Sequence, residues 1–213
     1  MNMNYQIPVK KLSNLVHTVS DASFLSDFIN QYYYGVVWDR QIPTNIQDWL
    51  NKTDPSLIPS FREICHKNEA REKIVNIFEN SLLIKQIETE WLIQDITKLT
   101  KVFSNLMKVD YFRLRMEVVS TNSCRKFHMD AVKSRLICTY RGQGTQYGIS
   151  MDGSSDPKNF KTTPTGSPIL LRGTLWIENN PKIILHRSPP IEGTGETRFV
   201  FVIDPIFDLE NEI

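Results

Sequence analysis

The chain has 213 residues, of which 40% are hydrophobic and 23% charged, and its formal net charge is +1 at pH 7. This length allows a sizeable core, and the near-zero charge argues against a global field that would attract nucleic acid or membranes. No apolar run approaches the roughly 20 residues needed to span a bilayer. No secretory signal is recognised, and the three cysteines are irregularly spaced, so we expect reduced thiols in a cytoplasmic protein.

The first half of the chain is predicted to be mainly helical. Apolar residues recur at helical spacing in residues 21–31, 45–52 and, over the longest stretch, 68–108. Residues 35–40 are a candidate for one short strand. We therefore expect residues 1–109 to form a mainly helical region that packs on the second half, and its helices offer a surface for a homodimer.

The second half changes to the period of β-strands. Residues 111–119 alternate between apolar and charged side chains, which predicts a strand with one apolar face. Segments rich in Gly, Pro and Ser separate the further predicted strands, which are residues 134–142, 167–178, 181–186 and 197–204. Helices followed by many strands predict an α+β chain, with residues 110–213 as a barrel core and both halves integrated in one domain.

The stretch CRKFHMD, residues 124–130, contains the pattern that points to chemistry. In an extended segment, His128 and Asp130 project to the same face and can hold one ion. The best candidate for a third ligand is His186, which lies on a later predicted strand. Two imidazoles and one carboxylate on one side of a metal form the facial triad that favours iron(II) and leaves positions open. The separation of the ligands along the chain suits a double-sheet jelly roll.

Arg198 adds an anion-binding group to this pattern. It lies inside the last apolar strand, on the face that carries Val200 and Val202. A buried guanidinium is costly without an anionic partner, and a bidentate contact with a carboxylate would supply one.

This layout of residues resembles the iron(II)- and 2-oxoglutarate-dependent dioxygenases over residues 110–204. The resemblance implies a jelly-roll (cupin-like) fold and the hydroxylation of a substrate C–H bond, but it names no substrate. It implies His128, Asp130 and His186 as iron ligands and Arg198 as the residue that holds the far carboxylate of 2-oxoglutarate.

Tyr140 and Arg115 are further candidates for contacts to this cosubstrate. The alternative for Tyr140 is packing in the core. The alternatives for Arg115 are a solvated strand face or, if that face lines the barrel, the binding of an anionic substrate.

Three longer blocks, CRKFHMD, RLICTYRGQGTQ and HRSPPIEGTGETR, resemble those of a bacterial family whose function is undefined. This second resemblance supports the order of the blocks and supplies no activity. Two other functions therefore stay open. The same barrel can bind zinc as a binding or sensing module without turnover, with Cys124 beside His128 as a thiolate ligand. The chain can also be a metal-free interaction protein that dimerises through its helices.

Overall fold

The structure is a computed structural model that describes residues 15–30, 33–83, 85–176 and 183–210. The elements in chain order are β1 (Val16–Val19), the 3-10 helix η1 (Ala22–Ser26), α2 (Asp27–Asn30), β2 (Gly35–Trp38), α3 (Thr44–Lys52), η2 (Pro55–Leu57), β3 (Phe61–His66), α4 (Ala70–Glu79), α5 (Ile87–Met107), β4 (Tyr111–Val119), β5 (Ser134–Arg141), β6 (Gln146–Ile149), β7 (Phe160–Thr162), β8 (Ile169–Arg172), β9 (Ile184–Arg187) and β10 (Arg198–Ile206).

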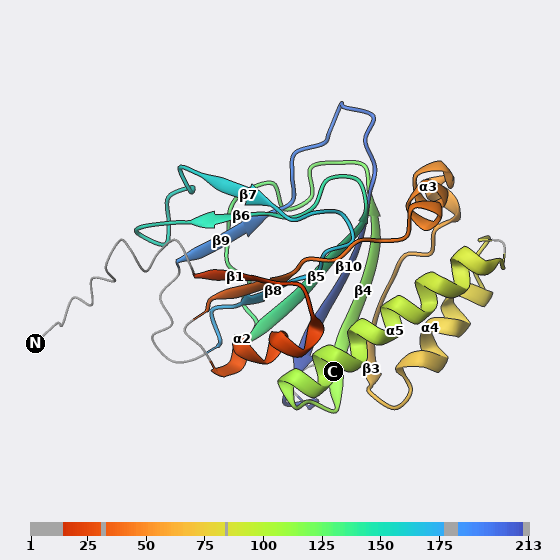
Figure 1. The fold of residues 1–213 in the computed structure, drawn as a ribbon, viewed down its shortest axis with the longest axis horizontal. Helices are drawn as coiled ribbons and strands as arrows, with labels where there is room; N and C mark the ends of the chain where they lie inside the picture. The colour runs from red at the N-terminus through yellow and green to blue at the C-terminus, as the bar shows by residue number, and fades with distance from the viewer. Residues whose placement is uncertain (1–14, 31–32, 84, 177–182, 211–213) are drawn as a thin grey trace, which may run out of the picture.

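Two sheets organise the molecule. A seven-stranded sheet has the order β1-β2-β8-β5-β10-β4-β3, and a three-stranded sheet has the order β7-β6-β9. Strands β1 and β2 pair in parallel, whereas the other neighbours pair antiparallel. The small sheet and the helices α4 and α5 lie on opposite sides of the large sheet (Figure 1). The strands from β4 to β10 thus form two facing sheets, the arrangement of the predicted jelly roll.

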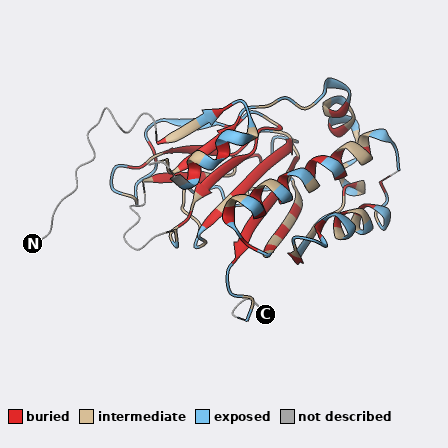
Figure 2. Cartoon of the chain, turned by 60° about the horizontal axis from the view of Figure 1, so that its bottom comes forward, coloured by how far each residue is buried: buried red, intermediate tan, exposed pale blue. Residues whose placement is uncertain are grey.

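Each face of the large sheet has its own hydrophobic core. On the helix side, the apolar residues of α5 recur every three or four positions and are fully buried, as Leu92, Ile96, Leu99 and Phe103 show. On the other side, Ile137 and Val202 pack against Tyr147 and Ile184 of the small sheet. The strands of the large sheet are therefore mostly buried, while α5 alternates between buried and exposed residues (Figure 2).

The N-terminal half contributes more than helices. It carries α2 to α5, but it also carries β1, β2 and β3, which occupy both edges of the large sheet. The structure therefore does not show the mainly helical first half that the sequence predicts, because this half contains strands as well as helices. Because β2 pairs with β8 and β3 pairs with β4, we propose that the two halves form one integrated domain.

The strands predicted in the second half are found with shifted bounds. Strands β4, β5 and β10 match their predicted segments within two residues. Strand β8 takes up only four residues of the predicted segment 167–178, and residues 177–182 lie outside the described chain. Strand β7 lies inside a segment that has the composition of a loop. Within the described residues, no helix is long and apolar enough to cross a membrane.

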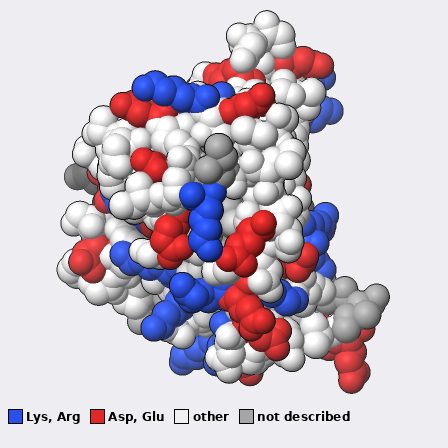
Figure 3. Space-filling view, turned by 90° about the vertical axis from the view of Figure 1, so that its right-hand side faces the viewer, with Lys and Arg blue, Asp and Glu red and all other residues white. Residues whose placement is uncertain are grey.

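Neither positive nor negative side chains gather on the face of the molecule at the right-hand side of Figure 1. Basic and acidic side chains are interspersed on the face drawn in Figure 3. This distribution agrees with the net charge of +1 and offers no extended basic patch there for nucleic acid.

Candidate metal centre

The backbone brings the two predicted histidine ligands together. The amide of His128 donates to the carbonyl oxygen of His186 at 3.0 Å, and the amide of His186 donates back at 2.9 Å. This isolated β-bridge places the His128 segment beside β9, at the edge of the small sheet. Residues that exchange two hydrogen bonds in this way have a fixed register, so the two side chains are held as neighbours.

Asp130 lies between the two imidazoles. Its Oδ1 is 3.4 Å from Nε2 of His128, and its Oδ2 is 3.0 Å from Nε2 of His186. The two rings have centroids 4.6 Å apart, and one donor atom from each of the three residues lies within 4.8 Å of the others. The structure thus brings together the three residues that the sequence predicts as a metal site.

The orientation of His128 leaves the required nitrogen available. Its Nδ1 lies 2.9 Å from the carbonyl oxygen of Lys126. A carbonyl oxygen only accepts hydrogen bonds, so a neutral ring carries its proton on Nδ1 and presents the lone pair of Nε2 toward Asp130. This arrangement is typical of histidines that bind metals, because the second hydrogen bond fixes the tautomer.

The carboxylate of Asp130 is held on one side by Arg135. Nη1 of Arg135 lies 2.6 Å from Oδ1, and the same guanidinium makes two bonds of 2.6 Å to Asp204. The other oxygen, Oδ2, is buried and accepts no hydrogen bond of good geometry from the described residues. A buried oxygen without a donor, next to two imidazole nitrogens, fits a divalent cation. The donor set of two nitrogens and one carboxylate oxygen suits iron(II).

The protonation states of Asp130 and His186 also suit the binding of a metal. Burial opposes ionisation of Asp130, but contacts with both histidines and the charge of Arg135 outweigh it and hold the pKa of Asp130 well below its usual range. Burial lowers the pKa of His186 despite the neighbouring carboxylate, whereas contact with Asp130 raises the pKa of His128. An ionised carboxylate and a neutral His186 are the forms that bind a metal.

Arg198 is buried without a carboxylate partner. Its side chain is 1% exposed, its Nε donates to the carbonyl oxygen of Gln143 at 2.6 Å, and its Nη2 donates to Oγ1 of Thr139 at 3.2 Å. Burial lowers its pKa to about 10, which the charge of Glu196 partly opposes. Among the described residues no acid forms an ion pair with this guanidinium, so an anion from outside the chain would balance its charge.

One pocket joins these groups. Arg198 lines it together with both histidines, Arg115 and the exposed Cys124. Apolar side chains from β5 and β10 form part of its wall. Although the thiol of Cys124 lies in this pocket, it is not among the donor atoms that converge within the described chain.

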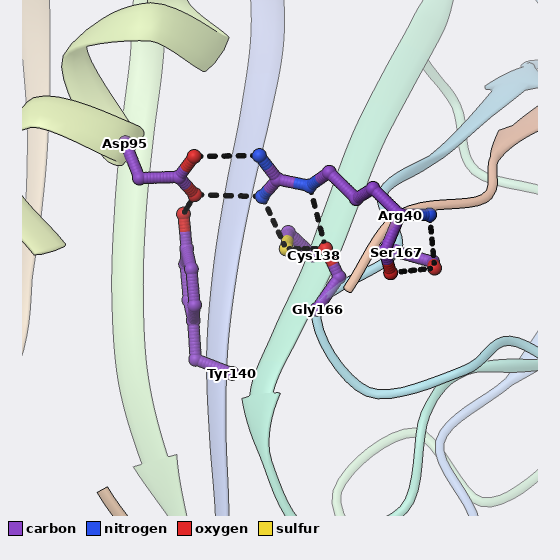
Figure 4. A network of polar contacts seen from close by, with 6 residues as sticks. All are labelled: Arg40, Asp95, Cys138, Tyr140, Gly166 and Ser167. Carbon is purple, nitrogen blue, oxygen red and sulfur yellow. Dashed lines mark hydrogen bonds and ion pairs between the residues drawn. The ribbon is translucent and has the colours of Figure 1, made fainter. Parts of the chain in front are cut away.

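The structure does not bring Tyr140 into the pocket. Tyr140 belongs to the helix-side core, and its hydroxyl donates to Oδ2 of Asp95 at 2.7 Å (Figure 4). Asp95 also accepts hydrogen bonds from both terminal nitrogens of Arg40. The placement of Tyr140 therefore supports its alternative role in packing.

Sequence reasoning missed two charged pairs that shape this region, Arg135 with Asp204 and Arg40 with Asp95. One signal for the first pair exists: both residues are charged and lie in strands that are mostly apolar. Two charges in buried strands need partners, and pairing them with each other is the simplest solution.

The comparison with solved structures finds proteins of similar fold at low sequence identity. A dioxygenase for auxin oxidation from Arabidopsis thaliana, solved with 2-oxoglutarate, is 9% identical, with a TM-score of 0.53 over 92% of this chain and 93% of that chain. The corresponding enzyme from rice is 11% identical, with a TM-score of 0.48 over 90% and 82% of the two chains. A prolyl-4-hydroxylase from Pseudomonas putida is 10% identical, with a TM-score of 0.46 over 89% and 95%. At such identity, the likeness to the Arabidopsis protein shows the fold alone.

Sequence comparison gives a family and no activity. No curated protein matches the sequence. The family model described as "Protein of unknown function (DUF1826)" matches residues 20–204, which is most of the chain. The chain therefore belongs to the DUF1826 family.

Proposed function

We propose that the chain is an iron(II)- and 2-oxoglutarate-dependent dioxygenase that hydroxylates a C–H bond of an organic substrate. The observation that carries the proposal is the pocket that both histidines of the triad share with Arg198, whose buried guanidinium forms no ion pair with a described acid. The jelly-roll fold, which the Arabidopsis dioxygenase shares at a TM-score of 0.53, supports it.

Each residue has a defined task in this proposal. His128, Asp130 and His186 hold the metal. Arg198, whose guanidinium contacts Thr139, binds the far carboxylate of 2-oxoglutarate through its fork of nitrogens. When bound, iron and 2-oxoglutarate supply the oxidation, in which dioxygen is consumed and succinate, carbon dioxide and a hydroxylated product form.

The rest of the pocket orients these groups and limits the access of water. The backbone bridge between the two histidines fixes their spacing. Arg135 holds the carboxylate of Asp130 through Oδ1 and thereby presents Oδ2 toward His186. The apolar side chains of Ile137 and Val202 exclude water from the floor of the pocket.

The test is turnover of the cosubstrate by the purified chain. We expect iron(II), 2-oxoglutarate and oxygen to give succinate, and His128→Ala or His186→Ala to abolish it. Arg198→Gln should raise the KM for 2-oxoglutarate. The control is His17→Ala, which removes a histidine of β1 that stacks on Tyr33. This variant should keep wild-type activity. A purified protein that binds no metal at stoichiometric level would contradict the proposal.

A second candidate function is zinc binding without turnover. One observation favours it, namely the thiol of Cys124 in the same pocket, because thiolate ligands favour zinc over iron. Thermal shift assays separate the two functions. Stabilisation by 2-oxoglutarate that is lost in Arg198→Gln supports the oxygenase, whereas stabilisation by zinc alone, weakened in Cys124→Ser, supports the binding module.

A further inference from the structure

Two arginines lie directly opposite each other beside the metal pocket. In the antiparallel pair of β3 and β4, Arg62 is the register partner of Arg115. Arg115 lines the pocket, while the alternate residues of β4, Phe112, Leu114 and Met116, are buried in the helix-side core. Both arginines therefore lie on the face of the sheet that carries the pocket.

This pair of like charges lacks a matching pair of acids. Cross-strand neighbours of equal charge destabilise a sheet. Nε of Arg115 is 3.5 Å from Oε1 of Glu117, and both side chains are partly exposed. Arg62 is exposed, and its side chain forms no hydrogen bond or ion pair with any described residue. One acid thus faces two cations, and an anion between the arginines would relieve their repulsion.

The other cations of the pocket already have partners. Arg135 is bound to Asp204 as well as to the candidate ligand Asp130. Arg187 donates from Nε to Oε1 of Gln146 at 2.8 Å, and its guanidinium carbon lies 4.4 Å from the ring centre of Phe127.

The guanidinium of Arg198 is held by Gln143 and by Thr139 of β5, whereas Arg115 lies on β4, at the other side of β10. Arg198 is opposite Val119 on β4, and Arg115 is four positions earlier on that strand. At about 3.3 Å per residue, their Cα atoms are separated by roughly 13 Å along the strands. A pocket that holds the cosubstrate at Arg198 therefore keeps a second anion site at Arg115.

We infer that Arg62 and Arg115 bind an anionic group of the substrate, a carboxylate or a phosphate, at the edge of the metal pocket. Arginine suits this task because its planar fork matches both groups with two parallel hydrogen bonds. The inference rests on the proposed function and adds the class of substrate: an acid whose reactive carbon reaches the triad while its anionic group stays on β3 and β4.

The experiment uses the full chain and simple anions as probes. Melting temperatures are measured in chloride, acetate and phosphate at equal ionic strength, for wild type, Arg62→Gln, Arg115→Gln and Arg198→Gln. Arg71→Gln is the matched control, because it removes an exposed arginine on α4. We expect acetate or phosphate to raise the melting temperature of the wild type and of Arg71→Gln. Arg62→Gln and Arg115→Gln should lose most of this shift, and the anion with the larger shift identifies the preferred group.

Three outcomes would overturn the inference: no added stability from acetate or phosphate in the wild type, an undiminished shift in the Arg62 and Arg115 variants, or a loss confined to Arg198→Gln. Succinate formation without added substrate is measured in parallel and reports on the proposed function separately. If succinate forms but acetate or phosphate raises the melting temperature of the Arg62 and Arg115 variants as much as that of the wild type, the anion site is wrong and the proposed oxygenase stands. If the shift depends on both arginines but no succinate forms, the anion site stands and the proposed oxygenase is contradicted.

Discussion

Asp95 on α5 is the central acid of a buried network that joins the helix layer to the large sheet (Figure 4). It accepts hydrogen bonds from Nη1 and Nη2 of Arg40 and, at 2.7 Å, from the hydroxyl of Tyr140. Arg40 also donates from Nε to the carbonyl oxygen of Gly166 at 2.7 Å. Asp95→Asn would replace the carboxylate with a neutral amide and leave the guanidinium buried without an anion.

The size of the effect follows from burial. The side chains of Arg40 and Asp95 are 13% and 8% exposed, so water screens their attraction only weakly. Removing one partner of a buried ion pair costs about 3–5 kcal/mol, which lowers the melting temperature of a chain of this size by on the order of 10 °C. Tyr140→Phe keeps both bonds to Arg40 and removes one bond to a charged acceptor, so its cost is smaller, about 1.5–3 kcal/mol.

The assay is urea unfolding and thermal melting of both variants, with Asp48→Asn as the control because Asp48 is an exposed acid on α3. The control should change the free energy of unfolding by less than about 0.5 kcal/mol. Binding of 2-oxoglutarate is measured alongside. Because Asp95 and Tyr140 lie on the helix side of the large sheet, we expect its Kd to stay unchanged in Tyr140→Phe.

Two results would refute this reasoning. If Asp95→Asn is no less stable than Asp48→Asn, the network of Figure 4 does not stabilise the fold. If Tyr140→Phe keeps wild-type stability but weakens binding of 2-oxoglutarate, Tyr140 contacts the cosubstrate, as the sequence alone allowed, and its placement in the core is wrong.

Three further predictions concern the pocket and the thiols. Asp204→Asn removes the acid that holds Arg135. We expect the affinity for manganese(II), measured by calorimetry, to fall about 10–100-fold. An unchanged affinity would show that Asp204 is not needed to hold Arg135 against Asp130. Adding iron(II) at 100 times its Kd should stabilise the fold by about 2.7 kcal/mol, a gain that chelation reverses and that His128→Ala should not show. Of the three thiols, only the exposed Cys124 should react quickly with Ellman's reagent in the native protein, because Cys65 and Cys138 are buried and burial raises their pKa to about 11 and about 12. Rapid reaction of all three thiols would contradict their burial.

Elements with a long regular period could be predicted from the sequence. The alternation in β4 and the three- and four-residue spacing in α5 reflect burial of one face, and that pattern is local. Strand β7 has three exposed residues and carries no such pattern. Strands β1 and β3 lie at the two edges of the large sheet, where they pair with β2 and β4. Local periodicity does not encode such pairing between segments.

The same limit applies to the site. The spacing of His128 and Asp130 predicts a common face, and the need for a ligand from another strand predicts His186 as the third residue. The Arg135–Asp204 pair joins residues separated by 69 positions, and one sequence does not say which buried charges meet. Tyr140 was ambiguous because alternation divides β5 into two faces without indicating which face carries the helices.

The pairing of β5 with β10 contains an irregularity next to Arg198. Val200 is opposite Thr139, but Phe199 is opposite Arg141, so the register skips Tyr140. Two residues of β5, Tyr140 and Arg141, therefore face one residue of β10, as in a β-bulge. The ring of Tyr140 lies 5.7 Å from that of Phe199, which keeps it in the helix-side core.

The bulge explains why Arg198 is the cation at this end of the pocket. Regular alternation from Thr139, whose hydroxyl contacts Arg198, would place Arg141 on the pocket face beside Arg198. Two adjacent guanidinium groups would repel each other and would compete for the same carboxylate. The extra residue instead turns Arg141 away, and its Nη1 donates to the carbonyl oxygen of Thr53 at 2.6 Å. The fold thereby pairs Arg141 with backbone behind the sheet and leaves Arg198 facing the pocket with its charge unbalanced, which is the condition that a cosubstrate carboxylate would meet.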